Sequence, residues 1–142
     1  MDTSKKNLED FPTNPKIKLA ALWTSVMFCY VYGDFFSLFV PNRIGKMMSN
    51  EAMLDTPEKL MAASVLMTVP SIMIAASVFL KPVLNRWLNI VFGILYTAIM
   101  LLIAFTSSGS WWTFYIYLAL VESLLTAYIV WTALKWPLIA NR

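Results

Sequence analysis

The chain's first long apolar run is LAALWTSVMFCYVYGDFFSLFV, residues 19–40, in which Asp34 is the only charged residue. A helix needs about 20 predominantly apolar residues to cross the hydrocarbon core of a bilayer. Strands of outer-membrane barrels are about 10 residues long and alternate between apolar and polar positions, unlike this continuous run. We therefore predict a transmembrane helix over residues 19–40.

Three further apolar runs decide the fold class. Residues 60–80 and 88–105 contain no charged residue, and Glu122 is the only one in residues 112–134. Of all 142 residues, 59% are hydrophobic and 13% are charged, whereas about 25% are charged in soluble domains. We predict an all-α fold, a transmembrane four-helix bundle over residues 19–137.

Local signals mark the ends of these runs. Residues that commonly cap helix N-termini precede or open each run: Asn14, Thr56, Asn85, and Ser108 or Ser110. Pro70 lies inside the second run and is expected to kink that helix, because proline removes one backbone hydrogen bond. Such a break is tolerated in a membrane where a neighbouring helix supplies a partner for the freed carbonyl.

The basic residues predict an orientation. Eight of the eleven Lys and Arg residues lie in the N-terminal tail (residues 1–18), between the second and third runs, or at the C-terminal end. The other three lie between the first and second runs. By the positive-inside rule, both termini are expected in the cytoplasm, including the short C-terminal tail, residues 138–142.

Composition excludes several kinds of chemistry. The chain has no His, which excludes His-based nucleophile pairs and His-ligated haem or zinc. Its single Cys, Cys29, excludes an intrachain disulfide, and four Gly provide no phosphate-binding loop. The net charge of +3 is too small and scattered for a nucleic-acid surface. We predict no particular cofactor, and an enzyme acting alone is the least supported class.

Asp34 and Glu122 are the two acids within the apolar runs, whose interiors contain no Lys or Arg to pair with them. A charged side chain at the bilayer centre costs at least about 2.5–3.5 kcal/mol, so such residues usually face the bundle interior and serve a function. From a rise of about 1.5 Å per residue, we expect them roughly 9 Å and 15 Å below the same membrane edge. They would share one pocket if the first and fourth helices pack together.

Helical spacing brings further groups to these acids. It places Tyr30 with Asp34, and Tyr115 and Thr126 with Glu122, so all five residues are predicted to bind a ligand or cation. Hydroxyls at similar depth on the other two helices are expected to hydrogen-bond a carboxyl: Thr68, Ser71, Tyr96 and Thr97. Two alternatives stay open. The acids lock helices together, or Asp34 pairs with Arg43 beyond the first run.

Two residues are expected to have structural roles. Gly33 permits close approach of a neighbouring helix. Arg86 lies at the inner interface, where its side chain extends to the headgroups or caps a helix.

Three stretches resemble a known family: LWTSVMFCYVYGDFF at residues 22–36, LNRWLNI at residues 84–90 and WTALKWP at residues 131–137. The resemblance, over about residues 15–137, is to small bacterial four-helix membrane proteins whose function is unknown. It implies an integral protein of the bacterial inner membrane. More distantly, the layout is similar to DoxX-like proteins, some of which are accessory subunits of quinone-linked oxidoreductases.

Three functions remain open on the sequence. The first is binding or transport of a proton, cation or small ligand at the intramembrane acids, with a metal neither indicated nor excluded. The second, implied by the DoxX-like resemblance, is an accessory subunit that binds quinone or another lipophilic ligand. The third is a structural or assembly subunit. The bilayer is one expected partner. A second copy is another, because four helices of this size enclose little volume.

Overall fold

The computed structural model describes residues 12–49, 51 and 53–137, and within them it is all-helical. Four helices are long and apolar enough to cross a membrane: α1 (Pro15–Ser37), α3 (Pro57–Phe79), α4 (Pro82–Thr106) and α5 (Thr113–Leu134). Helix α2 (Arg43–Met48) follows α1, and the 3₁₀ turn η1 (Ser110–Trp112) precedes α5. The predicted all-α fold with four candidate spans is confirmed.

Two of the predicted caps are present. The Asn14 side chain accepts a hydrogen bond from the Lys16 N–H at 3.0 Å, which starts α1 at Pro15. The Thr56 hydroxyl accepts from the Lys59 N–H at 3.3 Å. Residues 15–18, predicted as tail, therefore belong to α1. The rest of that tail before residue 12, and residues 138–142, lie outside the described residues.

The other two cap predictions are wrong. Helix α4 starts at Pro82, which needs no N–H partner, so Asn85 lies inside the helix. Neither η1 nor α5 has a side-chain cap. Helix α1 also ends at Ser37, before the predicted Val40, and the turn that follows includes Asn42 at φ 62°.

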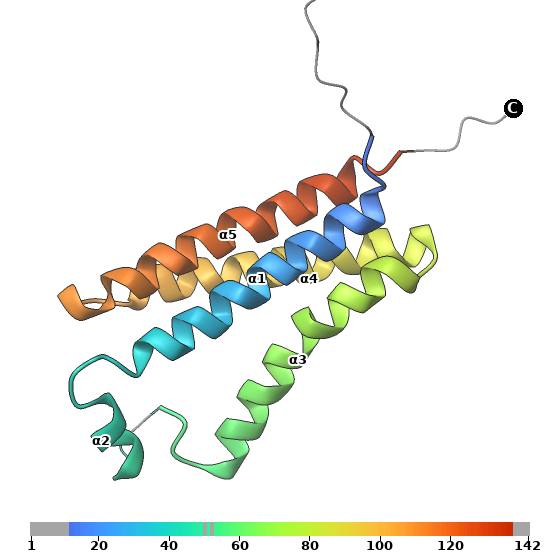
Figure 1. Ribbon diagram of the computed structural model, residues 1–142. Helices are drawn as coiled ribbons and strands as arrows, with labels where there is room; N and C mark the ends of the chain where they lie inside the picture. Colours follow the sequence, from blue (N-terminus) through green and yellow to red (C-terminus); the bar gives the residue numbers. More distant parts are fainter. Residues whose placement is uncertain (1–11, 50, 52, 138–142) are drawn as a thin grey trace, which may run out of the picture.

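The spanning helices run up and down between two ends (Figure 1). The start of α1, the end of α5 and the α3–α4 turn share one end, which we call the terminal end. Helix α2 and the α4–α5 turn lie at the other, which we call the loop end. Short connections join α3 to α4 and α4 to α5, as is usual between antiparallel neighbours, whereas a longer segment that contains α2 joins α1 to α3.

Helix α3 changes direction near its middle, where Pro70 lies (Figure 1). Pro70 has no N–H for the Leu66 carbonyl, and the Tyr96 hydroxyl of α4 donates to that carbonyl instead. The buried residues of α3 are Pro70, Met73 and Ser77, all at or after the bend. The first half of α3 therefore leaves the bundle, which opens at the loop end.

The terminal half contains most of the packed core. Trp23 of α1 is fully buried and meets Tyr96 edge to face, with ring centroids 5.9 Å apart. Its indole N–H donates to the Asn89 side chain at 2.7 Å. Asn89 donates to the Asn85 side chain at 2.7 Å, and Asn85 donates to the Ser77 carbonyl at 2.6 Å. This buried network joins α1, α3 and α4.

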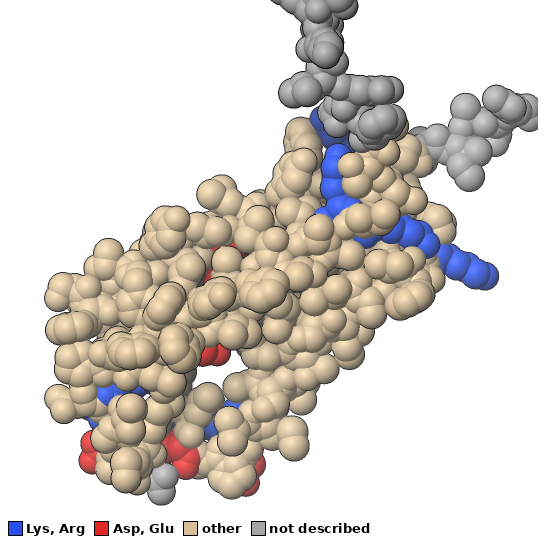
Figure 2. Space-filling model, viewed as in Figure 1, with Lys and Arg blue, Asp and Glu red and all other residues tan. Residues whose placement is uncertain are grey.

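The two ends of the bundle differ in the charged side chains that they carry (Figure 2). The described residues near the terminal end include five basic side chains and no acid: Lys16, Lys18, Lys81, Arg86 and Lys135. The loop end combines basic with acidic residues: Arg43, Lys46, Lys59, Glu51, Asp55 and Glu58. Lys59 and Asp55 form a salt bridge of 2.6 Å there, and donation by the Lys59 side chain lowers the pKa of Asp55.

Candidate functional site

Helices α1 and α5 bring the two intramembrane acids to one pocket, which we call the acid pocket. Its volume is about 50 Å³, enough for a few water molecules or a small cation. Four of the five predicted binding residues line it. The full lining is Tyr30, Gly33, Asp34, Met67, Met100, Ile103, Tyr115, Leu118, Ala119 and Glu122.

A larger cavity of about 480 Å³ lies next to the acid pocket, toward the loop end. We call it the mouth cavity. Asp34, Ile103 and Tyr115 line both spaces. The remaining lining comes from the end of α1, α2, the segment before α3, the end of α4 and η1: Ser37, Arg43, Met53, Thr106, Ser107, Ser108 and Trp112. The two spaces therefore adjoin along a path that reaches Glu122.

The acids occupy different depths on this path. Because α1 ends at Ser37, Asp34 lies in its last turn, about 4.5 Å from the helix end. Glu122 is nine residues into α5, about 13.5 Å from its start. The sequence predicted a smaller difference because it extended the first helix to Val40. Asp34 is thus exposed beside the mouth cavity, whereas Glu122 is only 4% exposed.

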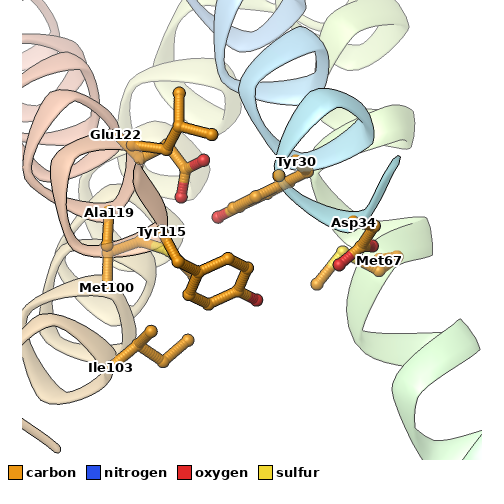
Figure 3. A pocket seen from close by; sticks show the side chains of 10 residues that line it. Tyr30, Asp34, Met67, Met100, Ile103, Tyr115, Ala119 and Glu122 are labelled. Carbon is orange, nitrogen blue, oxygen red and sulfur yellow. The ribbon is translucent and has the colours of Figure 1, made fainter. Parts of the chain in front are cut away.

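Each acid faces a tyrosine from the opposite helix (Figure 3). The Tyr30 ring extends from α1 toward the Glu122 carboxyl, and the Tyr115 ring extends from α5 toward Asp34. Tyr30 is 8% exposed, and its buried hydroxyl has no hydrogen-bond partner among the described residues. A buried hydroxyl without a partner is costly, so the Tyr30 hydroxyl is available to hydrogen-bond a group that enters the pocket.

Neither carboxyl is engaged by the described residues. The Thr126 hydroxyl donates to the Glu122 backbone carbonyl at 2.9 Å, and the Ser37 hydroxyl donates to the Asp34 backbone carbonyl at 2.7 Å. These bonds do not involve the carboxyl groups. The salt bridge found in this part of the chain, between Lys59 and Asp55, involves neither of them. No Lys or Arg lines the acid pocket. Its charge is therefore not balanced by a basic side chain in the lining.

The hydroxyls expected to bond the carboxyls bond other groups. Thr68, Ser71 and Thr97 each donate to the carbonyl four residues earlier in the same helix. This local acceptor is always within reach of a helical Ser or Thr. Tyr96 donates to the Leu66 carbonyl at the bend.

Thr126 does not line the acid pocket. Its hydroxyl lies 2.7 Å from that of Thr97, so it belongs to the contact between α4 and α5.

Arg43 lines the mouth cavity with Asp34 but does not form the salt bridge considered above. Its guanidinium lies over the Trp112 ring, 5.4 Å from the centroid. The Arg43 Nε is buried without a partner among the described residues. The sequence did not predict that Arg43 stacks on Trp112, because spacing along the chain does not show that α2 and η1 meet in space.

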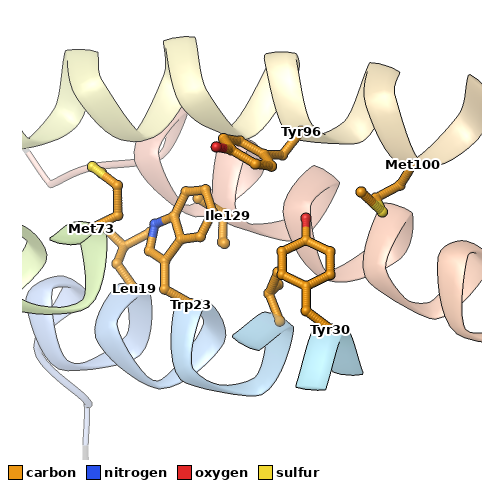
Figure 4. Packing of buried hydrophobic residues seen from close by; sticks show 8 residues of the cluster. Leu19, Trp23, Tyr30, Met73, Tyr96, Met100 and Ile129 are labelled. Carbon is orange, nitrogen blue, oxygen red and sulfur yellow. The ribbon is translucent and has the colours of Figure 1, made fainter. Parts of the chain in front are cut away.

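The floor of the acid pocket is the packed core (Figure 4). Tyr30 and Met100 belong to both, and Tyr96, Trp23 and Ile129 continue the packing toward the terminal end. The Leu118 and Tyr115 side chains pack near Gly33, 3.5 and 3.6 Å from where a Cβ would lie.

Arg86 lies outside the pocket and donates to the Leu134 carbonyl at the end of α5, at 3.5 Å.

The sequence did not predict several of the residues that line the acid pocket. Met67, Met100 and Ile103 line the acid pocket from α3 and α4. Apolar side chains of a membrane helix face lipid and core alike, so the sequence alone did not place these three at the pocket. The signal that was available lies on α5, where Tyr115, Leu118 and Glu122 follow the i, i+3, i+7 spacing of one helix face. Among the described residues, no three His, Cys, Asp or Glu side chains come together as metal ligands.

Comparison with known proteins gives a family and no activity. The model of a family described as "Family of unknown function (DUF6326)" matches residues 7–139. No curated protein and no solved structure matches the chain. The family match covers all four spanning helices and both acids of the pocket. The chain therefore belongs to the DUF6326 family, whose function is unknown.

Proposed function

We propose that this protein binds a small cation at the acid pocket, in a bacterial inner membrane, with Glu122 supplying the negative charge. One observation carries the proposal. The Glu122 carboxyl is buried with no basic partner in the pocket, opposite a tyrosine hydroxyl that has no hydrogen-bond partner among the described residues.

The physical argument is one of charge balance. An ionised carboxyl in a low-dielectric interior is costly unless it is paired, so Glu122 gains most from a bound proton or cation. The faces of the Tyr30 and Tyr115 rings attract cations as well. The pocket suits a monovalent ion or an ammonium group better than Ca²⁺, which takes six to eight oxygen ligands.

The alternatives have less support. A helix lock needs hydrogen bonds to the carboxyls, and Thr68, Ser71 and Thr97 donate to backbone carbonyls instead. Quinone binding rests on the distant resemblance, and the charges of Asp34 and Arg43 in the mouth cavity favour a charged ligand. Transport and a homodimer remain predictions that follow from the small size of the bundle.

Glu122→Gln tests the proposal, with ethanolamine in its ammonium form as the probe. Binding to the purified protein in detergent is measured by calorimetry. We expect Glu122→Gln to weaken binding about tenfold or more, since hydrogen bonds to charged groups contribute about 1.5–3 kcal/mol. The matched control is Glu58→Gln, an exposed acid in the first turn of α3.

The free energy of unfolding distinguishes a binding site from a contact that only holds the helices together. A binding carboxyl is held in the apolar interior at a cost, so Glu122→Gln is expected to unfold no more readily than the wild type. Unchanged ethanolamine binding in Glu122→Gln, or a loss of stability with no loss of binding, would contradict the proposal.

A further inference from the structure

Arg43 places a positive charge in the same path as the two acids. Its guanidinium lines the mouth cavity, stacks over Trp112 and has a buried Nε with no partner among the described residues. No acidic side chain forms a salt bridge with it in the described part of the chain. A guanidinium in this state lacks an acceptor, and phosphate and carboxylate groups fit it best.

The mouth cavity has room for such a group. Its volume of about 480 Å³ is within the range of about 300–1,000 Å³ typical of small-molecule sites. The hydroxyl residues Thr106, Ser107 and Ser108 line the same cavity as Arg43. The adjoining acid pocket, at about 50 Å³, admits only a small group. A negative site and a positive site therefore lie along one path of unequal width.

We infer that the ligand is a zwitterion that carries an ammonium group and a phosphate or carboxylate. The ammonium enters the narrow acid pocket between Asp34 and Glu122, and the anionic group lies against Arg43 in the mouth cavity. This inference rests on the proposed cation site and adds the second half of the ligand. Two sources carry this chemistry: a phosphoethanolamine lipid headgroup and a free aminophosphate or amino acid.

Three probes separate the two halves of the ligand: O-phosphoethanolamine, ethanolamine and inorganic phosphate. For the wild type in detergent, we expect O-phosphoethanolamine to bind about tenfold more tightly than either of the others, because it engages both charged sites. Equal affinity for ethanolamine and O-phosphoethanolamine would overturn the inference and leave the cation site standing.

Arg43→Gln is the decisive variant. We expect it to reduce O-phosphoethanolamine affinity about tenfold, to the level of ethanolamine, and to leave ethanolamine affinity within about twofold of wild type. Lys46→Gln is the matched control, since Lys46 lies on the same short helix and does not line the cavity. Equal effects of the two substitutions on O-phosphoethanolamine would also overturn the inference.

Arg43→Lys is the control for an effect of Arg43→Gln on folding. It retains the charge and loses the two-pronged geometry, so we expect intermediate affinity for O-phosphoethanolamine. Loss of ethanolamine binding in Glu122→Gln tests the other half. If Glu122→Gln leaves ethanolamine binding unchanged, the cation site fails, whereas a failure confined to Arg43 removes only the zwitterion.

Lipid nanodiscs distinguish the two sources. The protein is placed in bilayers of phosphatidylcholine with and without phosphatidylethanolamine, and binding of free O-phosphoethanolamine is measured. A lipid headgroup as ligand predicts competition, with at least about tenfold weaker binding when phosphatidylethanolamine is present. A free zwitterion predicts equal binding in both bilayers, and no binding in either would overturn the inference.

Discussion

The two glycines of the spanning helices, Gly33 and Gly93, have different surroundings. A Cβ on Gly33 would meet the Leu118 and Tyr115 side chains at ordinary contact distances, from 3.5 Å. A Cβ on Gly93 would lie 2.6 Å from the Val130 Cγ2. The close approach of helices expected at Gly33 is thus tighter at Gly93, between α4 and α5. Nothing in the sequence around Gly93 marked it, because helical spacing within α4 does not show where the side chains of α5 lie.

Gly93→Ala and Gly33→Ala form a matched pair of substitutions. We expect Gly93→Ala to lower the free energy of unfolding by about 1–3 kcal/mol relative to Gly33→Ala, because the extra methyl group overpacks the contact with α5. Both gain the same helix propensity, about 1 kcal/mol, which cancels in the comparison. Denaturation in mixed micelles measures the difference. Equal stability of the two variants would show that the Val130 side chain moves aside without a loss of stability.

At the scale of the elements, the bend of α3 determines where the protein opens. Pro70 leaves the Leu66 carbonyl without its helical partner, and the Tyr96 hydroxyl donates a hydrogen bond to this carbonyl. The helix is thereby held to α4 at the bend, while its first half contributes no buried residue. The sequence predicted the bend at Pro70 and a partner on a neighbouring helix for the freed carbonyl. It assigned the Tyr96 hydroxyl to a carboxyl because depth alone does not distinguish two acceptors.

Tyr96→Phe is expected to loosen this bend. Loss of the hydrogen bond lowers the free energy of unfolding by about 0.6–1.7 kcal/mol, from the average to the largest value measured for hydrogen bonds between helices in one membrane protein. Amide hydrogen exchange is expected to increase in residues 57–69 and to stay unchanged in α5. Tyr117→Phe is the control, because Tyr117 is exposed and its hydroxyl makes no hydrogen bond with the described residues.

A double-mutant cycle tests the mechanism at the bend. Pro70→Ala restores a backbone N–H, which supplies the Leu66 carbonyl with a partner within α3. In that background, Tyr96→Phe is expected to cost markedly less. An equal cost in both backgrounds would mean that Tyr96 acts through packing against Trp23 and not through the carbonyl.

For the whole molecule, charge and shape distinguish the two ends. Basic residues without acids surround the terminal end among the described residues, and the loop end mixes both signs (Figure 2). The core fills the terminal half, and the mouth cavity opens toward the loop end. If the positive-inside rule holds here, the mouth cavity faces away from the cytoplasm.

Labelling of introduced cysteines tests this orientation. In a Cys29→Ala background, Ser49→Cys at the loop end is expected to react with a membrane-impermeant maleimide in intact cells. Thr13→Cys at the terminal end is expected to react only after the cells are permeabilised. Both positions are exposed in the structure, so accessibility is matched. The reverse pattern would invert the predicted topology.

The sequence by itself determined the membrane-protein class, the four helices long enough to span a bilayer and the identity of the two acids within them. These properties follow from uninterrupted apolar length and from the cost of charge in lipid, which are local to each run. Only the tertiary structure decided that Asp34 lies at the mouth and Glu122 at the base of one path, with Arg43 beside the entrance. The faces of these helices are apolar toward lipid and toward the core alike, so periodicity does not show which side chains meet.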